Sequence, residues 1–201
     1  MIDSIIANKP NSIFDVVPRE LFVADFDTAY LDSGNYWEWN YAIAKTIQPK
    51  TYLEVGVRFS YSFIPTLLGS ESLEYALGYD LETYGNISHA KDNIEKYYKG
   101  SCKCELQHVD SQQIAELPQF FDLINIDGEH TVIGKMHDLH LTIDHCKYVI
   151  VDDYDYLRDV RVAVDWFLKE YGGNGWGRQS IIEWATYIPT FRGSMMIKYH
   201  V

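Results

Sequence analysis

The chain has 201 residues, which is long enough for one well-buried domain and too short for two domains of ordinary size. Its 29 acidic and 17 basic residues give a formal net charge of -12, so we expect neither a nucleic acid nor an anionic membrane surface as a partner. Apolar residues make up 47% of the chain, and none of their runs is as long as a membrane span. The three cysteines give no even disulfide framework, so we expect reduced thiols and a cytoplasmic protein. A small molecule is the expected partner.

Helical and strand patterns alternate along most of the chain. Residues 1–34 lack a sustained period and predict an irregular or partly helical preface or lid, which leaves residues 35–201 as a single domain. We expect helices at 35–47, 62–68, 88–98, 132–139 and 158–171, and strands at 52–55, 73–79, 105–109, 120–126, 148–151, 180–188 and 194–200.

Strands that alternate with helices predict a parallel sheet covered on both faces, because parallel neighbours need right-handed crossovers. The last two strands, joined by a turn at 189–193, predict an antiparallel hairpin. The expected fold class is therefore α/β: one Rossmann-like three-layer domain with a mostly parallel seven-stranded sheet and a C-terminal antiparallel hairpin. The exposed hairpin edge and the N-terminal preface also suggest a homodimer.

The first strand runs into a turn, TYLEVGVRFSYS, that carries Glu54, Gly56, Ser60 and Ser62. This turn lacks the G-x-G-x-x-G pattern, so a cradle for a pyrophosphate is not indicated. A nucleoside ligand without a diphosphate fits the turn better.

An acid stands at or near the end of each expected parallel strand. Ligands of open α/β sheets bind outside the carboxyl ends of the strands, so these acids are candidate site residues. They are Glu54, Asp80, Asp110, Asp127, and Asp152 with Asp153. Asp80 follows the second strand and is the candidate for the hydroxyls of a ribose; the alternative is that it only caps its own turn.

Three of these acids, Asp127, Asp152 and Asp153, end two neighbouring strands of the expected sheet. Three carboxylates at one point repel one another unless a cation is present, and hard oxygen ligands favour Mg²⁺, Ca²⁺ or Mn²⁺. The alternative is that Asp127 lies on the cofactor side while Asp152 or Asp153 caps the following helix.

The segments EVGVRFSYS, GYD, HVDS, INIDGEH and VIVDDY together resemble the class I S-adenosylmethionine-dependent methyltransferases. The resemblance covers roughly residues 35–171 and is greatest to the small metal-assisted O-methyltransferases of the catechol and macrocin types. It implies a methyl transfer from S-adenosylmethionine to a hydroxyl of a small acceptor, such as a sugar or a natural-product intermediate, assisted by Mg²⁺ or another hard divalent cation.

The resemblance also implies a role for each strand-end residue. Glu54 and Gly56 would approach the methionine portion of the cofactor, and Ser62 would bind its carboxylate. Ser60 stands in this turn where the family usually has glycine. The remaining residues would contact the rest of the cofactor or the cation. Asp80 would bind the ribose, and Asp110 and Ser111 would lie against the adenine. Asp127 would lie on the cofactor side and also bind the cation, together with Asp152 and Asp153.

Two residues of the DGEH segment are candidates for the general base. His130 takes the position of a lysine in catechol-type enzymes, and Glu129 the position of an acid in macrocin-type enzymes. Imidazole titrates close to neutral pH, so His130 preserves a base. A metal-independent methyltransferase of the same fold and a non-catalytic nucleoside-binding module remain as alternatives.

Overall fold

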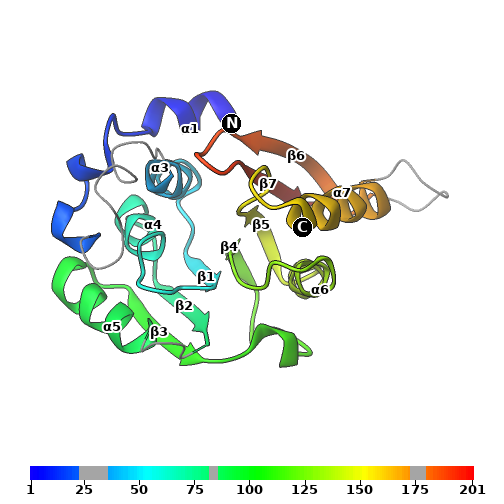
Figure 1. Ribbon diagram of the computed structural model, residues 1–201. Helices are drawn as coiled ribbons and strands as arrows, with labels where there is room; N and C mark the ends of the chain where they lie inside the picture. Colours follow the sequence, from blue (N-terminus) through cyan, green and yellow to red (C-terminus); the bar gives the residue numbers. More distant parts are fainter. Residues whose placement is uncertain (23–35, 82–85, 173–179) are drawn as a thin grey trace.

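The computed structural model describes residues 1–22, 36–81, 86–172 and 180–201. These residues form an α/β domain around one seven-stranded sheet with the order β3-β2-β1-β4-β5-β7-β6 (Figure 1). The strands are β1 (Thr51–Val55), β2 (Tyr75–Asp80), β3 (Lys103–His108), β4 (Phe121–Ile126), β5 (Cys146–Val151), β6 (Ile182–Ile188) and β7 (Ser194–Tyr199). The predicted fold class is confirmed.

The C-terminal hairpin is built into the sheet in an order that the sequence pattern does not predict. β7, the second strand of the hairpin, pairs antiparallel with β5, with Val151 opposite Met195. β6 pairs with β7 and forms the edge of the sheet. The turn between β6 and β7 therefore lies at the same end of the sheet as the carboxyl end of β5.

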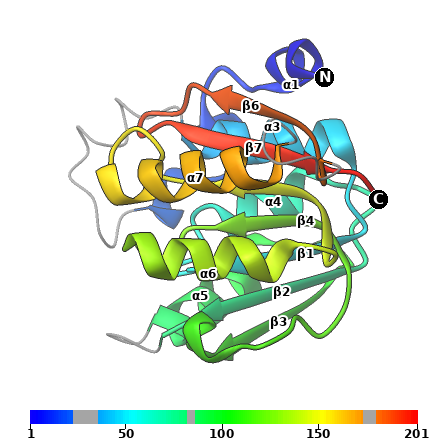
Figure 2. The same cartoon turned by 90° about the vertical axis from the view of Figure 1, so that its right-hand side faces the viewer.

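Helices cover both faces of the sheet (Figure 2). One face carries α3 (Trp37–Ile47), α4 (Phe63–Gly69) and α5 (Asn86–Tyr97), and the other carries α6 (Val132–Thr142) and α7 (Arg158–Tyr171). The apolar stripe of α7, with Val160, Val164 and Phe167 buried, packs on the β4 and β5 side of the core. α7 thus buries one apolar stripe against the sheet, as the 3.6-residue period predicts.

The N-terminal segment packs against the domain. It contains α1 (Ile2–Asn8) and two 3₁₀ turns, η1 (Ile13–Asp15) and η2 (Arg19–Leu21). Ile5 joins the core cluster that includes Ile43 of α3, and Phe22 stacks on Trp37 with 4.3 Å between the ring centroids. The predicted boundary after residue 34 lies outside the described residues.

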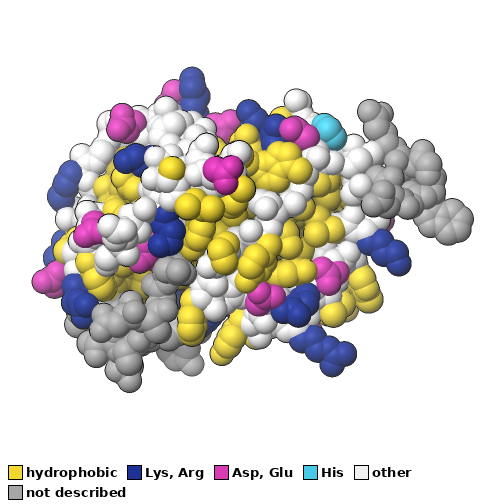
Figure 3. All heavy atoms as spheres, turned by 90° about the horizontal axis from the view of Figure 1, so that it is seen from above, with side chains coloured by type: hydrophobic (Ala, Val, Ile, Leu, Met, Phe, Trp, Pro, Cys, Tyr) yellow, Lys and Arg dark blue, Asp and Glu magenta, His cyan; other side chains and the backbone are white. Residues whose placement is uncertain are grey.

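Figure 3 shows the face that carries α1 and the edge strand β6, seen from above the view of Figure 1. Apolar side chains gather across the middle of this face, and charged side chains surround them. Ile6 and Tyr187 are exposed large apolar residues of these two elements, at 54% and 43%. The homodimer stays a prediction. Among the described residues, no helix is both long and apolar enough to cross a membrane.

The reversal of strand order lies between β1 and β4. These strands are parallel neighbours, yet the helices that follow them, α4 and α6, lie on opposite faces of the sheet (Figure 2). The carboxyl ends of such a strand pair form the crevice where open α/β sheets bind ligands. Gly56 and Asp127 meet in this crevice, because a Cβ atom at Gly56 would lie 2.4 Å from the Asp127 carbonyl oxygen.

Candidate cofactor and metal site

A cavity of about 310 Å³ opens at the carboxyl ends of the parallel strands. Asp80, Asp110 and Ser111 line one end of the cavity. Asp127, His130 and Asp153 also line it, on the β4 and β5 side. The cavity thus joins the residues predicted to hold a nucleoside with those predicted to act in catalysis or metal binding.

The turn after β1 has an unusual backbone. Gly56, Arg58 and Ser60 have φ values of 92°, 48° and 67°, all in the left-handed region that favours glycine. Ser60 is fully buried, and its Oγ donates a hydrogen bond to the Phe59 carbonyl oxygen at 2.5 Å. Ser60 therefore adopts a conformation of the kind that a glycine would supply at this position.

Glu54 and Ser62 bind each other behind this turn. Ser62 Oγ donates a hydrogen bond to Glu54 Oε1 at 2.5 Å, and the Tyr52 hydroxyl donates to Glu54 Oε2. Complete burial raises the pKa of Glu54 to about 8, although both hydrogen bonds lower it. Ser62 also lines a smaller adjoining cavity of about 70 Å³, beside Trp37.

Asp80 links the turn after β1 to the start of α5. Its Oδ2 accepts a hydrogen bond from the Arg58 backbone N–H at 2.6 Å, and its Oδ1 accepts one from Asn86 Nδ2 at 3.2 Å. Asp80 therefore braces a neighbouring turn while it faces the cavity.

Asp110 begins a short 3₁₀ turn, η4 (Ser111–Gln113), and its Oδ1 accepts a hydrogen bond from the Gln112 backbone N–H at 3.0 Å. The side chain thus caps the turn that brings Ser111 to the cavity wall.

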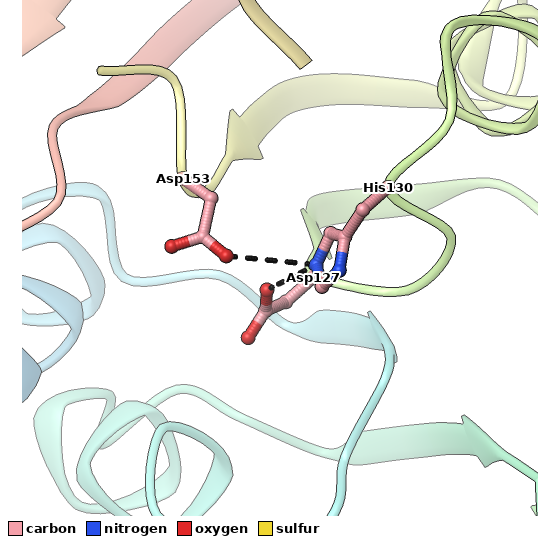
Figure 4. A group of neighbouring side chains, drawn as sticks. All are labelled: Asp127, His130 and Asp153. Carbon is pink, nitrogen blue, oxygen red and sulfur yellow. Dashed lines mark ion pairs between the residues drawn. The ribbon is translucent and has the colours of Figure 1, made fainter. Parts of the chain in front are cut away.

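Two aspartates and a histidine form the acid–histidine group at the ends of β4 and β5 (Figure 4). His130 Nε2 lies 3.5 Å from Asp127 Oδ1 and 3.5 Å from Asp153 Oδ2. One ligand atom from each residue lies within 4.8 Å of the others. Carboxylate oxygens and an imidazole nitrogen at this spacing fit a divalent cation between them.

The third predicted metal-binding aspartate lies apart from the acid–histidine group. Asp152 is 2% exposed, and its Oδ1 accepts a hydrogen bond from Ser194 Oγ at 2.8 Å. Burial, reinforced by the charge of Asp153, raises the pKa of Asp152 to about 8. Asp153 has a φ of 60°. Burial and the charge of Asp127 raise the pKa of Asp153 as well.

Two cations near these acids were not identified from the sequence. Arg192, in the turn between β6 and β7, places Nη1 3.2 Å from Asp153 Oδ1 and 3.5 Å from Asp153 Oδ2. Its guanidinium also lies 4.7 Å from the centre of the Tyr156 ring. Only the pairing of β7 with β5 brings this turn to the site, and no local pattern signals that pairing.

Lys135 is the second cation. It is fully buried on α6, and within the described ranges its Nζ has no hydrogen-bond partner. Burial lowers its pKa, while Asp127, Asp138 and Asp153 raise it. The sequence signal that could have found Lys135 was its position on the apolar face of a helical pattern.

Glu129 lies just before α6 and binds backbone N–H groups there. Its Oε1 accepts hydrogen bonds from the backbone N–H groups of His130 and Thr131, both at 3.0 Å, and Thr131 Oγ1 accepts one from the Gly134 N–H at 3.1 Å. Glu129 also lines the cavity, so both candidate bases lie on its wall.

Solved structures of methyltransferases share this fold at low sequence identity. The SAH-bound methyltransferase PaMTH1 of Podospora anserina is 18% identical, with 82% of this chain and 78% of that chain covered and a TM-score of 0.63. An O-methyltransferase of Bacillus cereus in complex with SAH is 16% identical, with coverages of 90% and 85% and a TM-score of 0.62.

A third structure is TomG, the O-methyltransferase of Streptomyces achromogenes involved in tomaymycin synthesis, in complex with SAM. It is 14% identical, with coverages of 81% and 78% and a TM-score of 0.59. No protein-family model matches the sequence, and neither does any curated protein. The chain has the fold of the class I S-adenosylmethionine-dependent methyltransferases.

Proposed function

We propose that this chain is an enzyme that transfers the methyl group of S-adenosylmethionine to a hydroxyl of a small molecule, assisted by a divalent cation. One observation carries the proposal: a single cavity joins Asp80 and Ser111 to the acid–histidine group. A methyl donor and its acceptor have to meet in one space for an in-line transfer, and this cavity offers a wall of suitable chemistry for each.

The β2 and β3 side of the cavity suits the nucleoside of the donor. A carboxylate at Asp80 can accept hydrogen bonds from the vicinal hydroxyls of a ribose. Ser111, on the turn after β3, is proposed to lie against the adenine, and Ser62, beside the smaller cavity, is proposed to bind the carboxylate of the methionine portion. SAH and SAM in structures of the same fold support a cofactor of this type.

The acid–histidine group suits the acceptor. A cation held there would supply Lewis-acid chemistry that lowers the pKa of an acceptor hydroxyl. His130 and Glu129 both line this part of the cavity and are the proposed groups to take the hydroxyl proton. The acceptor class, a sugar or a natural-product-like alcohol, remains part of the proposal.

The ion pair between Arg192 and Asp153 favours a second candidate, a methyltransferase of the same fold that uses no metal. In that case the guanidinium offsets the charge of Asp153. Metal-stripped protein that turns over at the full rate in the presence of a chelator would establish this candidate and exclude a cation-assisted transfer.

A thermal-shift panel of S-adenosylmethionine, S-adenosylhomocysteine, NAD and NADP tests the cofactor. We expect the first two ligands to raise the unfolding temperature, because a ligand that binds only the folded state stabilises it. Stabilisation by the dinucleotides alone would refute the assignment. Incubation of the protein with labelled S-adenosylmethionine and a panel of hydroxylated acceptors then tests the transfer itself.

A further inference from the structure

The donors that the fold brings together differ from the three aspartates expected for a magnesium site. Two of them, Asp127 and Asp153, do converge, but the third ligand atom of the acid–histidine group is His130 Nε2. Asp152 follows the same strand as Asp153 and is directed elsewhere, into a hydrogen bond with Ser194. The donor set is therefore two carboxylate oxygens and one imidazole nitrogen.

We propose that the acid–histidine group binds a first-row transition-metal ion, of the class of Mn²⁺, Fe²⁺, Co²⁺ or Zn²⁺, with His130 as a direct ligand. This proposal refines the cation-assisted transfer proposed above and rests on it. Imidazole is a common ligand of transition metals, whereas Mg²⁺ is held by oxygen ligands and water. One nitrogen among three donors therefore shifts the preference of the site away from Mg²⁺.

The spacing of the donors supports shared coordination. Bonds of about 2.0–2.2 Å to one ion place neighbouring donors roughly 3.0–3.5 Å apart. The two separations from His130 Nε2, to Asp127 Oδ1 and to Asp153 Oδ2, are both 3.5 Å. Figure 4 shows the three side chains converging from the loops after β4 and β5. The two aspartate oxygens belong to the same group, whose ligand atoms all lie within 4.8 Å of one another.

Neighbouring groups orient two of the ligands. Arg192 Nη1 contacts both oxygens of Asp153, at 3.2 Å from Oδ1 and 3.5 Å from Oδ2, and Oδ2 is also the oxygen that lies 3.5 Å from His130 Nε2. On the other side, the His130 backbone N–H donates to Glu129 Oε1 at the start of α6. The contacts with Arg192 fix the direction of the Asp153 carboxylate, and the bond to Glu129 fixes the backbone that carries His130.

The placement of Asp152 supports the same donor set. Its carboxyl is almost fully buried, and its Oδ1 is occupied by Ser194. Among the described residues, Asp152 is not part of the group whose ligand atoms lie within 4.8 Å of one another. A consequence for the reaction is that His130 Nε2, as a ligand, is not available as the general base, which leaves Glu129 for that role.

The test uses metal-stripped full-length protein without an affinity tag. Mn²⁺ and Mg²⁺ are titrated separately by calorimetry, and the Mn²⁺ form is examined by pulsed electron paramagnetic resonance for hyperfine coupling to ¹⁴N. We expect Mn²⁺ to bind at least about tenfold more tightly than Mg²⁺. We also expect a ¹⁴N coupling in the wild type.

Three variants assign the signal. His130→Ala should lose the ¹⁴N coupling and weaken Mn²⁺ binding by about 100-fold or more. His140→Ala, an exposed histidine of α6 outside the acid–histidine group, is the matched control and should retain both. Asp152→Asn should retain them as well, because its carboxyl is outside the donor set.

Absence of the ¹⁴N coupling from the Mn²⁺ form would overturn the proposal. So would a loss of Mn²⁺ binding in Asp152→Asn with unchanged binding in His130→Ala, or a failure of the wild type to bind either metal. A titration with S-adenosylhomocysteine on the same samples reports on the methyltransferase function independently. A protein that binds Mn²⁺ through nitrogen but does not bind S-adenosylhomocysteine would refute the proposed function and leave the metal ligands assigned.

Discussion

Ser62 donates a hydrogen bond to Glu54 across the first turn, with 2.5 Å between Ser62 Oγ and Glu54 Oε1. Both residues were predicted to meet the methionine portion of a cofactor, and in this structure they meet each other. The Tyr52 hydroxyl occupies the second carboxyl oxygen of Glu54. The acid of the first motif thus ties β1 to the start of α4, so its protonation state affects the stability of the turn.

The first prediction concerns the dependence of stability on pH. The folded chain raises the pKa of Glu54 from 4.5 to about 8, chiefly by burial, so the folded state binds a proton more tightly than the unfolded state between these values. This contribution to the free energy of unfolding is complete below about pH 4.5 and is lost as the pH rises through about 8. Glu54→Gln, which imitates the protonated acid, should flatten this decline by up to about 1.4 kcal/mol per pH unit.

Chemical denaturation of metal-free protein at several values between pH 5 and pH 9 checks this prediction. The exposed Glu71 provides a matched control, since Glu71→Gln should leave the slope unchanged. The pKa of Asp152 is raised too, so this residue also makes stability decline as the pH rises. In Glu54→Gln the slope of stability against pH should therefore be reduced rather than abolished. Equal slopes for the wild type and Glu54→Gln would show that Glu54 is ionised in the folded protein at neutral pH.

The second prediction concerns Ser60, which stands where the methyltransferases that the sequence resembles usually have glycine. Its φ of 67° costs a residue with a Cβ atom about 1 kcal/mol. Ser60→Gly should therefore increase the free energy of unfolding by about that amount, and S-adenosylhomocysteine should still bind. Ser60→Ala keeps the backbone cost and loses the hydroxyl, so it should be no more stable than the wild type. A less stable Ser60→Gly would mean that the Ser60 hydrogen bond outweighs the backbone strain.

The third prediction separates two strand-end aspartates. Asp80 faces the cavity and is proposed to bind a ribose, so Asp80→Asn should weaken the binding of S-adenosylhomocysteine by roughly tenfold to 100-fold. Asp110 caps a 3₁₀ turn, and asparagine is an equally good cap, so Asp110→Asn should bind with nearly the wild-type affinity. Isothermal titration of the two variants side by side provides the measurement. Equal losses would imply that Asp80 acts through the turn it braces rather than through the ribose.

Much of the fold could be predicted because its helices and strands carry local signals. The apolar stripe of α7 predicts its bounds, Arg158–Tyr171, and the alternation of strands with helices predicts the parallel sheet. The order of β6 and β7 could not be predicted in the same way. A hairpin can join a sheet by either of its strands, and the choice depends on packing against β5 rather than on local sequence.

The candidate site shows the same division. That strand-end residues converge follows from the parallel sheet, and Asp127, His130 and Asp153 do come together. The direction of each side chain depends on partners distant in sequence, which the pattern of acids does not reveal. Asp152 is hydrogen-bonded to Ser194 and lies outside the acid–histidine group. Arg192 reaches Asp153 only because β7 lies beside β5.

The last prediction concerns the contact between Gly56 and Asp127. Gly56 has a φ of 92°, and a Cβ atom there would lie 2.4 Å from the Asp127 carbonyl oxygen. Gly56→Ala should therefore lower the free energy of unfolding by about 1–3 kcal/mol and displace Asp127 from the cavity wall. We expect this variant to lose measurable binding of S-adenosylhomocysteine under conditions where it remains folded, as monitored by circular dichroism and calorimetry.

Gly69→Ala is the matched control for this variant. A Cβ atom at Gly69 would lie 2.4 Å from the Tyr41 carbonyl oxygen, an equally close approach, but Gly69 ends α4 and does not line either cavity described above. Both variants should lose stability, because neither backbone can yield without a shift of its neighbour. Only Gly56→Ala should also lose cofactor affinity in the folded protein. If the two variants bind S-adenosylhomocysteine equally well, the close contact between Gly56 and Asp127 serves folding alone, and cofactor binding does not depend on the crevice between β1 and β4.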